Sequence, residues 1–256
     1  MCKILFNIEL RDQNAFPVAI DIEKEEFEIF SNIDSCFFDS FGNNINIDNS
    51  FFSKNSIVED ESRYSVTVEN GICKKEKLRN QFKNNDIATI VLLLESPHTS
   101  EYCVENKKLI PIGPARGSGP LDAGTGIENY LENILNKVNL SEGKYKVTIA
   151  NPVQFQTSLG SIHGKTLADK RVNNVRNLIW KGIWSFDAVK DNFNERLINY
   201  NPVRIINACT KDLQENVNNE LIAKGYGEVT YKTYHPAMNW CRYGVDIPVK
   251  KLNEHS

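Results

Sequence analysis

Long hydrophobic runs are scarce in this sequence of 256 residues. The longest uninterrupted apolar run covers residues 90–94, far fewer than the roughly 20 residues that a membrane-spanning helix needs. The opening stretch MCKILFNIELRDQN contains Glu9 and Asp12, where a secretory signal peptide would need continuous apolar residues. We therefore expect a cytoplasmic protein that does not bind a membrane.

The sequence also lacks the closely spaced cysteines of metal sites. Its six cysteines lie about 30 or more residues apart, so no CxxC pair is available to ligate zinc or an iron–sulfur cluster. We therefore expect free thiols, no metal, no iron–sulfur cluster and no other cofactor. A net charge of −3 argues against a protein that coats nucleic acid by bulk electrostatic attraction, but it allows a local basic groove.

Residues 1–80 have the pattern of a β-rich module. The segments KILFNIEL, FPVAIDI and RYSVTVENGICKK predict extended strands, and Asn70-Gly71 fits a turn between two of them. The charged stretch at 74–85 predicts a helix. We interpret residues 1–80 as an N-terminal module or extension that precedes a second domain at 81–256.

In residues 81–256, buried strands alternate with amphipathic helices. The predicted strands are 88–94, 145–151, 203–209 and 228–234. The predicted helices are 126–138, a long helical region within 166–199, and 211–224. This alternation predicts an α/β fold with three layers (αβα) around a central, mostly parallel sheet, in addition to the β-rich N-terminal extension.

Polar residues follow three of the predicted strands. The sequence ESPH (95–98) follows the first strand, Asn151 follows the second and His235 follows the last. Because open parallel sheets bind ligands beyond the carboxyl ends of their strands, we expect these residues to meet in one cleft. Taken singly, each has a plainer explanation as a helix cap, a turn residue before proline or a hydrogen-bonded loop histidine. Their joint occurrence at successive strand ends favours a functional site.

The first of these segments resembles a motif of the uracil-DNA glycosylase superfamily. In one branch the first motif is written GEAPGxxE, and LESPHTSE (94–101) is similar to it, with Glu95, Pro97 and Glu101 in register.

The later segments resemble the remaining motifs of that superfamily in the same order. GSGPLDAGTG (117–126) is similar to the Gly/Pro stretch before a helix, and VTIANPV (147–153) is similar to the middle motif, a strand that ends in Asn. YHPAMNW (234–240) is similar to the final HPSP motif. The resemblance covers residues 88–240, whereas about the first 80 residues have no counterpart.

The resemblance implies a monofunctional DNA glycosylase. Such an enzyme flips a base out of DNA, hydrolyses its N-glycosidic bond and leaves an abasic site. The catalyst must stabilise an oxocarbenium-like sugar and an anionic base, and it must place a water at the sugar carbon. In the family, the histidine that corresponds to His235 donates to the base oxygen, and the asparagine that corresponds to Asn151 reads the base edge. The positions that hold the water and flank the base correspond to Glu95, Ser96, Pro97 and His98.

Two of these positions depart from the family pattern. Ser96 replaces an Asp that orients water in the best-known branch, although the GEAPG branch has Ala there. Water activation would then fall to Glu95, Glu101 or Asp122. His98 replaces a Tyr that blocks 5-substituted pyrimidines in the best-known branch.

The substrate base therefore stays open between uracil and a modified pyrimidine. An amide has one acceptor and two donors, so the middle-motif Asn alone cannot choose uracil over cytosine. The absent Asp and Tyr favour a 5-substituted cytosine, such as the hydroxymethylated or glucosylated bases of phage DNA. A role in antiviral defence would follow.

Contacts to DNA are predicted from two groups of residues. Met238, Asn239 and Trp240 are candidates for a wedge that enters the minor groove, and packing of Trp240 in the core is the plainer alternative. Arg116 and Lys165 are candidates for phosphate contacts, and simple solvation is their alternative.

Two other functions remain open from the sequence. Ser96 favours a non-catalytic protein that binds nucleic acid or nucleotides and keeps a glycosylase-like fold. A hydrolase of free nucleosides is the third possibility.

Overall fold

The computed structural model describes the chain except for residues 12–14, 33–37, 79–86, 107, 159–169 and 254–256. The chain forms two compact units, each assembled from three segments. Unit 1 contains Met1–Glu59, Ser96–Gly113 and Val153–Asp191. Unit 2 contains Asp60–Glu95, Pro114–Pro152 and Asn192–Ser256. The two units therefore interleave along the sequence.

Unit 1 is built on a four-stranded sheet in the order β2-β1-β4-β3. Its strands are β1 (Cys2–Ile8), β2 (Phe16–Ile22), β3 (Phe38–Phe41) and β4 (Asn44–Ile47). Along β1, buried Ile4, Phe6 and Ile8 alternate with half-buried residues, so that one face of the sheet forms a core. The other elements are α1 (Lys24–Ser31), η1 (Asn49–Phe52), η2 (Lys54–Ser56), η3 (Thr99–Glu101), β8 (Tyr102–Glu105), β9 (Lys108–Pro111) and α4 (Lys170–Trp184).

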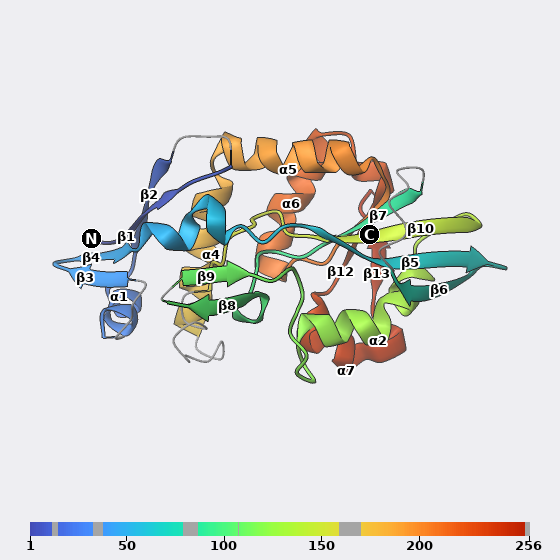
Figure 1. The fold of residues 1–256 in the computed structure, drawn as a ribbon, viewed down its shortest axis with the longest axis horizontal. Coiled ribbons are helices and arrows are strands. Elements are labelled where there is room, and N and C mark those ends of the chain that lie inside the picture. Colours follow the sequence, from blue (N-terminus) through green and yellow to red (C-terminus); the bar gives the residue numbers. More distant parts are fainter. Residues whose placement is uncertain (12–14, 33–37, 79–86, 107, 159–169, 254–256) are drawn as a thin grey trace. The chain divides into compact units, whose positions relative to one another are not determined.

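Unit 2 is built on a sheet of seven described strands in the order β13-β12-β11-β7-β10-β5-β6 (Figure 1). Its strands are β5 (Glu61–Glu69), β6 (Ile72–Lys77), β7 (Ala88–Leu93), β10 (Gly143–Ala150), β11 (Pro202–Asn207), β12 (Thr230–Thr233) and β13 (Val249–Lys251). The central strands β10, β7, β11 and β12 are parallel, whereas β13 at one edge and the β5–β6 hairpin at the other are antiparallel. The chain therefore belongs to the mixed α/β class, as predicted.

The central strands of unit 2 are apolar on both faces and contact a helix on each. Ile90 and Leu92 of β7 pack in one core with Ile127 and Leu131 of α2 (Ala123–Leu135). On the opposite face, Asn207 of β11 donates to Asn218 of α6 (Lys211–Ala223) at 2.9 Å. The continuous apolar run that the sequence shows is thus explained by burial from two sides.

The remaining helical elements of the described chain connect these parts. They are α5 (Asp187–Tyr200), which spans the division between the units, and η4 (Gly227–Val229), η5 (Pro236–Trp240), α7 (Cys241–Tyr243) and η6 (Gly244–Asp246). No helix in the described ranges has the length and apolar character to cross a bilayer.

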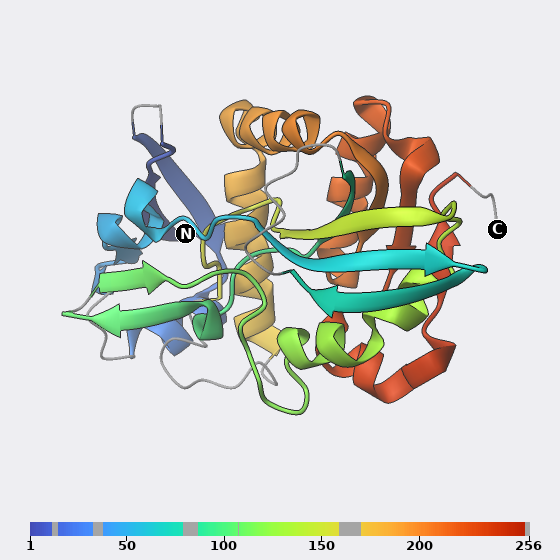
Figure 2. The same cartoon turned by 45° about the vertical axis from the view of Figure 1, so that its right-hand side comes forward.

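The charged stretch after residue 72 is a strand, not the predicted helix. Residues Ile72–Lys77 form β6, which pairs with β5 at the edge of the sheet (Figure 2). Lysines are common on edge strands because they oppose pairing with another chain, and the same charge pattern also suits an exposed helix. The rest of the predicted helix, 79–85, lies outside the described residues. The turn at Asn70 and Gly71, with φ of 51° and 73°, is confirmed.

Candidate functional site

The carboxyl ends of the four parallel strands place polar residues along one edge of unit 2. Asn151 follows β10, Glu95 follows β7 after Leu94, Thr210 lies beyond β11, and His235 lies beyond β12. Because neighbouring strands are about 4.8 Å apart, the backbones of Asn151 and His235 are separated by three strand spacings, or roughly 14 Å. Three predicted site residues, Glu95, Asn151 and His235, thus share this edge.

Asn151 is buried, with 1% of its surface exposed, and its side-chain amide is unsatisfied. Neither Oδ1 nor Nδ2 makes a hydrogen bond within the part of the chain that the structure describes. A buried polar group without a partner costs about 1–3 kcal/mol, so such groups call for an explanation. An amide that is reserved for a ligand, which would supply the missing donor and acceptor, is one explanation.

The backbone of Asn151 is held by a buried ion pair that the sequence did not suggest. Asp60 pairs with Arg196, and their side chains are 2% and 15% exposed. Oδ1 of Asp60 accepts from the backbone N–H of Asn151 at 3.4 Å, and Nη2 of Arg196 donates to the carbonyl oxygen of Asn151 at 3.1 Å. Arg196 also donates to the carbonyl of Pro152 at 3.3 Å, and the Tyr200 hydroxyl donates to Asp60 at 3.0 Å. This network fixes the chain on both sides of the Asn151 side chain.

Glu95 is buried beside the end of β11. It is 7% exposed, and its Oε2 accepts a hydrogen bond from the backbone N–H of Thr210 at 3.1 Å. Burial, and then the nearby Glu95 carboxylate, raise the pKa of Cys209 well above its usual value. Cys209 therefore stays a neutral thiol and donates to the carbonyl of Leu94. Among the acidic candidates, Glu95 lies at the sheet edge between Asn151 and His235.

His235 lines a hollow of about 540 Å³ in unit 2. Its Nδ1 accepts a hydrogen bond from the backbone N–H of Ala237 at 3.3 Å. In a neutral imidazole one nitrogen accepts and the other carries the proton, so this bond assigns the proton to Nε2. Other residues that line the hollow are Thr210, Lys211, Gln214, Lys232, Asn239 and Lys250. Asn151 is not among the residues that line it.

The segment after His235 is held against the N-terminal end of α2. A Cβ atom on Gly126 would lie 2.3 Å from the carbonyl oxygen of Pro236, so only glycine allows this approach. The N–H of Met238 donates to Leu121 at 3.0 Å. Met238 has φ of 56°, unusual for a residue with a side chain, and is 61% exposed.

The other two wedge candidates differ from Met238. Trp240 is fully buried, and its Nε1 donates to the carbonyl of Tyr234 at 2.6 Å. The packed alternative therefore applies to Trp240, which is not placed to enter a groove in this conformation. Asn239 is half-buried and lines the His235 hollow.

Several predicted residues belong to unit 1 and are described within it. The Ser96 hydroxyl shares a hydrogen bond with the Thr157 hydroxyl at 2.9 Å. Nδ1 of His98 is 3.1 Å from the Thr99 hydroxyl. Two further residues of the first motif, Pro97 and Glu101, are buried.

Two of the remaining predicted residues, Asp122 and Arg116, have structural partners. Asp122 precedes α2, and its Oδ2 accepts from the backbone N–H of Gly119 at 2.8 Å, so it shapes the turn before the helix. Arg116 donates to Glu61 at 2.7 Å. Lys165 lies outside the described residues.

Comparison with protein-family models, with curated proteins and with solved structures finds no match for this chain. Within the described ranges, no group of three or more His, Cys, Asp or Glu residues is placed to hold a metal ion. A function must therefore be inferred from the residues of this chain.

Proposed function

We propose that this chain is a monofunctional DNA glycosylase of the uracil-DNA glycosylase superfamily. It would release a flipped-out uracil or modified pyrimidine from DNA and leave an abasic site. The observation that carries the proposal is the buried Asn151 amide without a partner, on the same sheet edge as an imidazole whose Nε2 carries a proton. The four parallel strands, with helices on both faces, would be the core of the three-layer fold of that superfamily.

Asn151 and His235 act on the base in this proposal. The Asn151 amide offers one acceptor and two donors, which match the edge of uracil in one orientation and the edge of cytosine in the other. As the glycosidic bond breaks, negative charge grows on a base oxygen, and Nε2–H of His235 donates to that oxygen. A donor of this kind typically contributes about 10²–10³ in rate.

Glu95 is the acidic residue that best fits the task of holding the attacking water. It is buried at the sheet edge, between the strands that lead to Asn151 and His235. Asp122, by contrast, precedes α2 and shapes the turn before that helix. Met238, which is exposed in the same unit, would fill the gap that the flipped base leaves in the DNA.

A modified pyrimidine is the preferred substrate in this proposal. The hollow beside His235 measures about 540 Å³, within the roughly 300–1,000 Å³ that is typical of sites for drug-sized ligands. Asn151 does not line this hollow, so the hollow would hold only the part of the substrate that lies beside His235. The three lysines at this hollow could donate hydrogen bonds to the hydroxyls of a hydroxymethyl or glucosyl group.

A panel of oligonucleotides tests this function. Each carries one uracil, 5-hydroxymethylcytosine or glucosylated 5-hydroxymethylcytosine in single- and double-stranded form, and alkali converts abasic sites into strand breaks. We expect breaks with at least one modified base and none with unmodified DNA. No break with any oligonucleotide would refute the proposal.

A non-catalytic DNA-binding protein is the second candidate. It is favoured by Ser96, which replaces an acid and whose hydroxyl is hydrogen-bonded to Thr157. This candidate predicts DNA binding that His235→Ala leaves intact, without abasic product at any time. Release of base from free nucleosides, with no requirement for a strand, would indicate the third candidate instead.

A further inference from the structure

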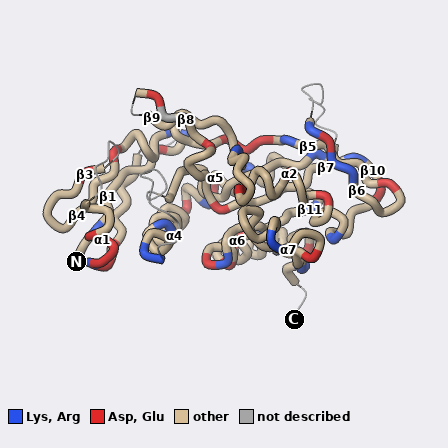
Figure 3. Tube along the Cα trace, turned by 90° about the horizontal axis from the view of Figure 1, so that it is seen from below, with Lys and Arg blue, Asp and Glu red and all other residues tan. Residues whose placement is uncertain are grey.

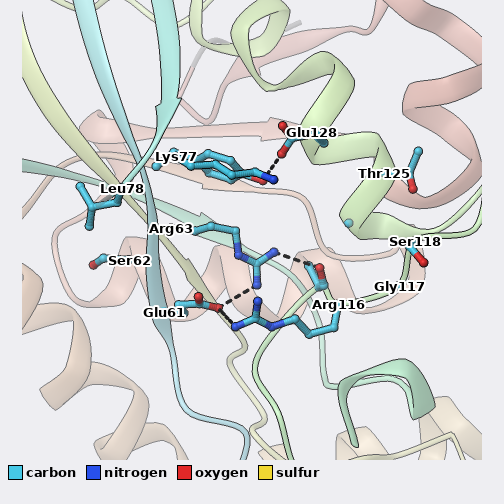
Figure 4. A pocket seen from close by; sticks show the side chains of 13 residues that line it. Glu61, Ser62, Arg63, Lys77, Leu78, Arg116, Gly117, Ser118, Thr125 and Glu128 are labelled. Atoms are coloured by element: carbon cyan, nitrogen blue, oxygen red, sulfur yellow. Dashed lines mark hydrogen bonds and ion pairs between the residues drawn. The ribbon is translucent and has the colours of Figure 1, made fainter. Parts of the chain in front are cut away.

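A second hollow in unit 2, of about 1020 Å³, lies between the β5–β6 hairpin and the segment that leads into α2 (Figure 4). It shares no lining residue with the hollow beside His235. Its lining includes three cations, Arg63, Arg116 and Lys77, and the hydroxyls of Ser118 and Thr125. We call it the arginine hollow.

The two arginines share a single carboxylate. Nη2 of Arg63 is 2.8 Å from Oε2 of Glu61, and Nη2 of Arg116 is 2.7 Å from the same oxygen. The three side chains together therefore carry a net charge of about +1, and Figure 4 shows the two guanidinium groups side by side. Glu61 alone does not neutralise this side of the hollow.

Arg63 is held firmly but is not fully satisfied. Its Nη1 donates to the carbonyl of Ala115 at 2.9 Å, and its Nη2 also donates to the carbonyl of Pro114. Its Nε is buried and makes no hydrogen bond to any described residue. A buried donor on a charged group is costly to leave unpaired, so a shift of the Arg63 side chain toward an anion in the hollow would relieve that cost.

The other carboxylate of the arginine hollow is already engaged. Glu128 accepts from the Tyr64 hydroxyl at 2.8 Å and lies 3.5 Å from Nζ of Lys75. Its negative charge is therefore balanced locally and offers little repulsion to an incoming anion. Lys74 and Lys77 are exposed on the neighbouring strand, and Figure 3 shows Lys and Arg gathered along β6.

We propose that the arginine hollow binds a phosphate group. Two guanidinium groups beside hydroxyls match a phosphate, which accepts several hydrogen bonds at once and prefers arginine forks. The phosphate would come from a DNA strand or from a free nucleotide. The first source rests on the proposed function, since the strand that presents the base would continue across unit 2, whereas the second source does not.

The salt dependence of DNA binding tests the first source. A 20-base-pair duplex without modified bases is used, so that turnover does not interfere. Arg116→Gln and Arg63→Gln are compared with wild type and with Lys144→Gln, which removes an exposed charge from β10. Removing one cation that binds a phosphate should reduce the slope of log K against log [salt] by about 0.9 for duplex DNA. The control should keep the wild-type slope.

Arg116→Gln guards against a folding artefact, because the Arg116 side chain is 39% exposed and its ion pair with Glu61 is partly solvated.

Calorimetry with deoxycytidine monophosphate tests the second source. If nucleotide binding depends on the arginines and the DNA slope does not, the ligand is a free nucleotide. If neither probe depends on Arg63 or Arg116, the inference is wrong.

These outcomes separate this inference from the proposed function. If the salt slope depends on the arginines but the protein releases no base from any oligonucleotide, the phosphate site is supported and the glycosylase proposal is wrong. If the protein releases base normally, but the variants keep the wild-type slope and no nucleotide binds, the glycosylase proposal is supported and the phosphate site is wrong.

Discussion

Replacing Asp60 by alanine should destabilise this protein far more than the loss of an ordinary surface acid. The Asp60 side chain is 2% exposed, and it accepts hydrogen bonds from Arg196, from Tyr200 and from the backbone of Asn151. Its removal leaves the Arg196 guanidinium, which is 15% exposed, without its counter-charge.

The size of the effect follows from that burial. Removing one partner of a buried ion pair typically costs about 3–5 kcal/mol, because the other charge stays in a poorly solvated place. The exposed pair between Lys3 and Asp21, whose side chains are 45% and 60% exposed, is the matched control. Asp21→Ala should cost no more than about 1 kcal/mol.

Urea unfolding at neutral pH measures both changes as differences in the free energy of unfolding. If Asp60→Ala and Asp21→Ala shift it equally, the buried network does not hold the structure as described. The double variant Asp60→Leu/Arg196→Met separates stability from positioning. It should recover part of the lost free energy because no charge stays unpaired, but it should not recover base release, since the backbone of Asn151 loses its anchors.

Three further changes test other parts of the structure. Burial, and then the hydrogen bond to Glu128, raise the pKa of Tyr64 from 10.0 to about 12. The stabilising contribution of the neutral Tyr64 side chain is therefore present below pH 10.0 and is lost as the pH rises to about 12. Across this pH range, the free energy of unfolding measured in urea should fall less for Tyr64→Phe than for the wild type. An equal fall in both proteins would contradict this account of Tyr64. Gly126→Ala forces a Cβ against the carbonyl oxygen of Pro236, so it should lower the free energy of unfolding by about 1–3 kcal/mol in the same assay and slow base release. A free energy of unfolding and a rate of base release like those of the wild type would argue against the close approach. Met238→Gly relieves a positive φ and should not lower the free energy of unfolding. Its rate of base release should fall more on duplex DNA than on single strands, and an equal fall on both would exclude a wedge.

Local sequence patterns predicted the central part of the fold well. The apolar run at 88–94 corresponds to β7, and the alternating strands and helices that follow match β10, α6 and β12 within a few residues. These elements are long or strongly periodic, and burial on both faces leaves a clear signal. The position of Glu95, Asn151 and His235 on one edge follows from parallel strand order.

Long-range pairing was not readable from the sequence. The local pattern places β5 and β6 in an N-terminal module, but β5 pairs with β10 and extends the large sheet. Asp60 lies in the charged stretch SIVEDES, which gives no sign that its partner is Arg196. Arg63 likewise has the pattern of a surface residue of a strand, although its guanidinium is largely buried. Such contacts depend on which distant segments meet, and local propensity carries no information about that.

Single-turnover base release by wild type, His235→Ala and Asn151→Asp tests most directly whether one imidazole and one amide act on the same base. We expect the wild-type protein to release at least one base of the oligonucleotide panel and His235→Ala to slow its release by about 10²–10³. Asn151→Asp should change which base is released, because a carboxylate lacks the amide donors. Rates and base preference like those of the wild type in both variants would contradict this shared role.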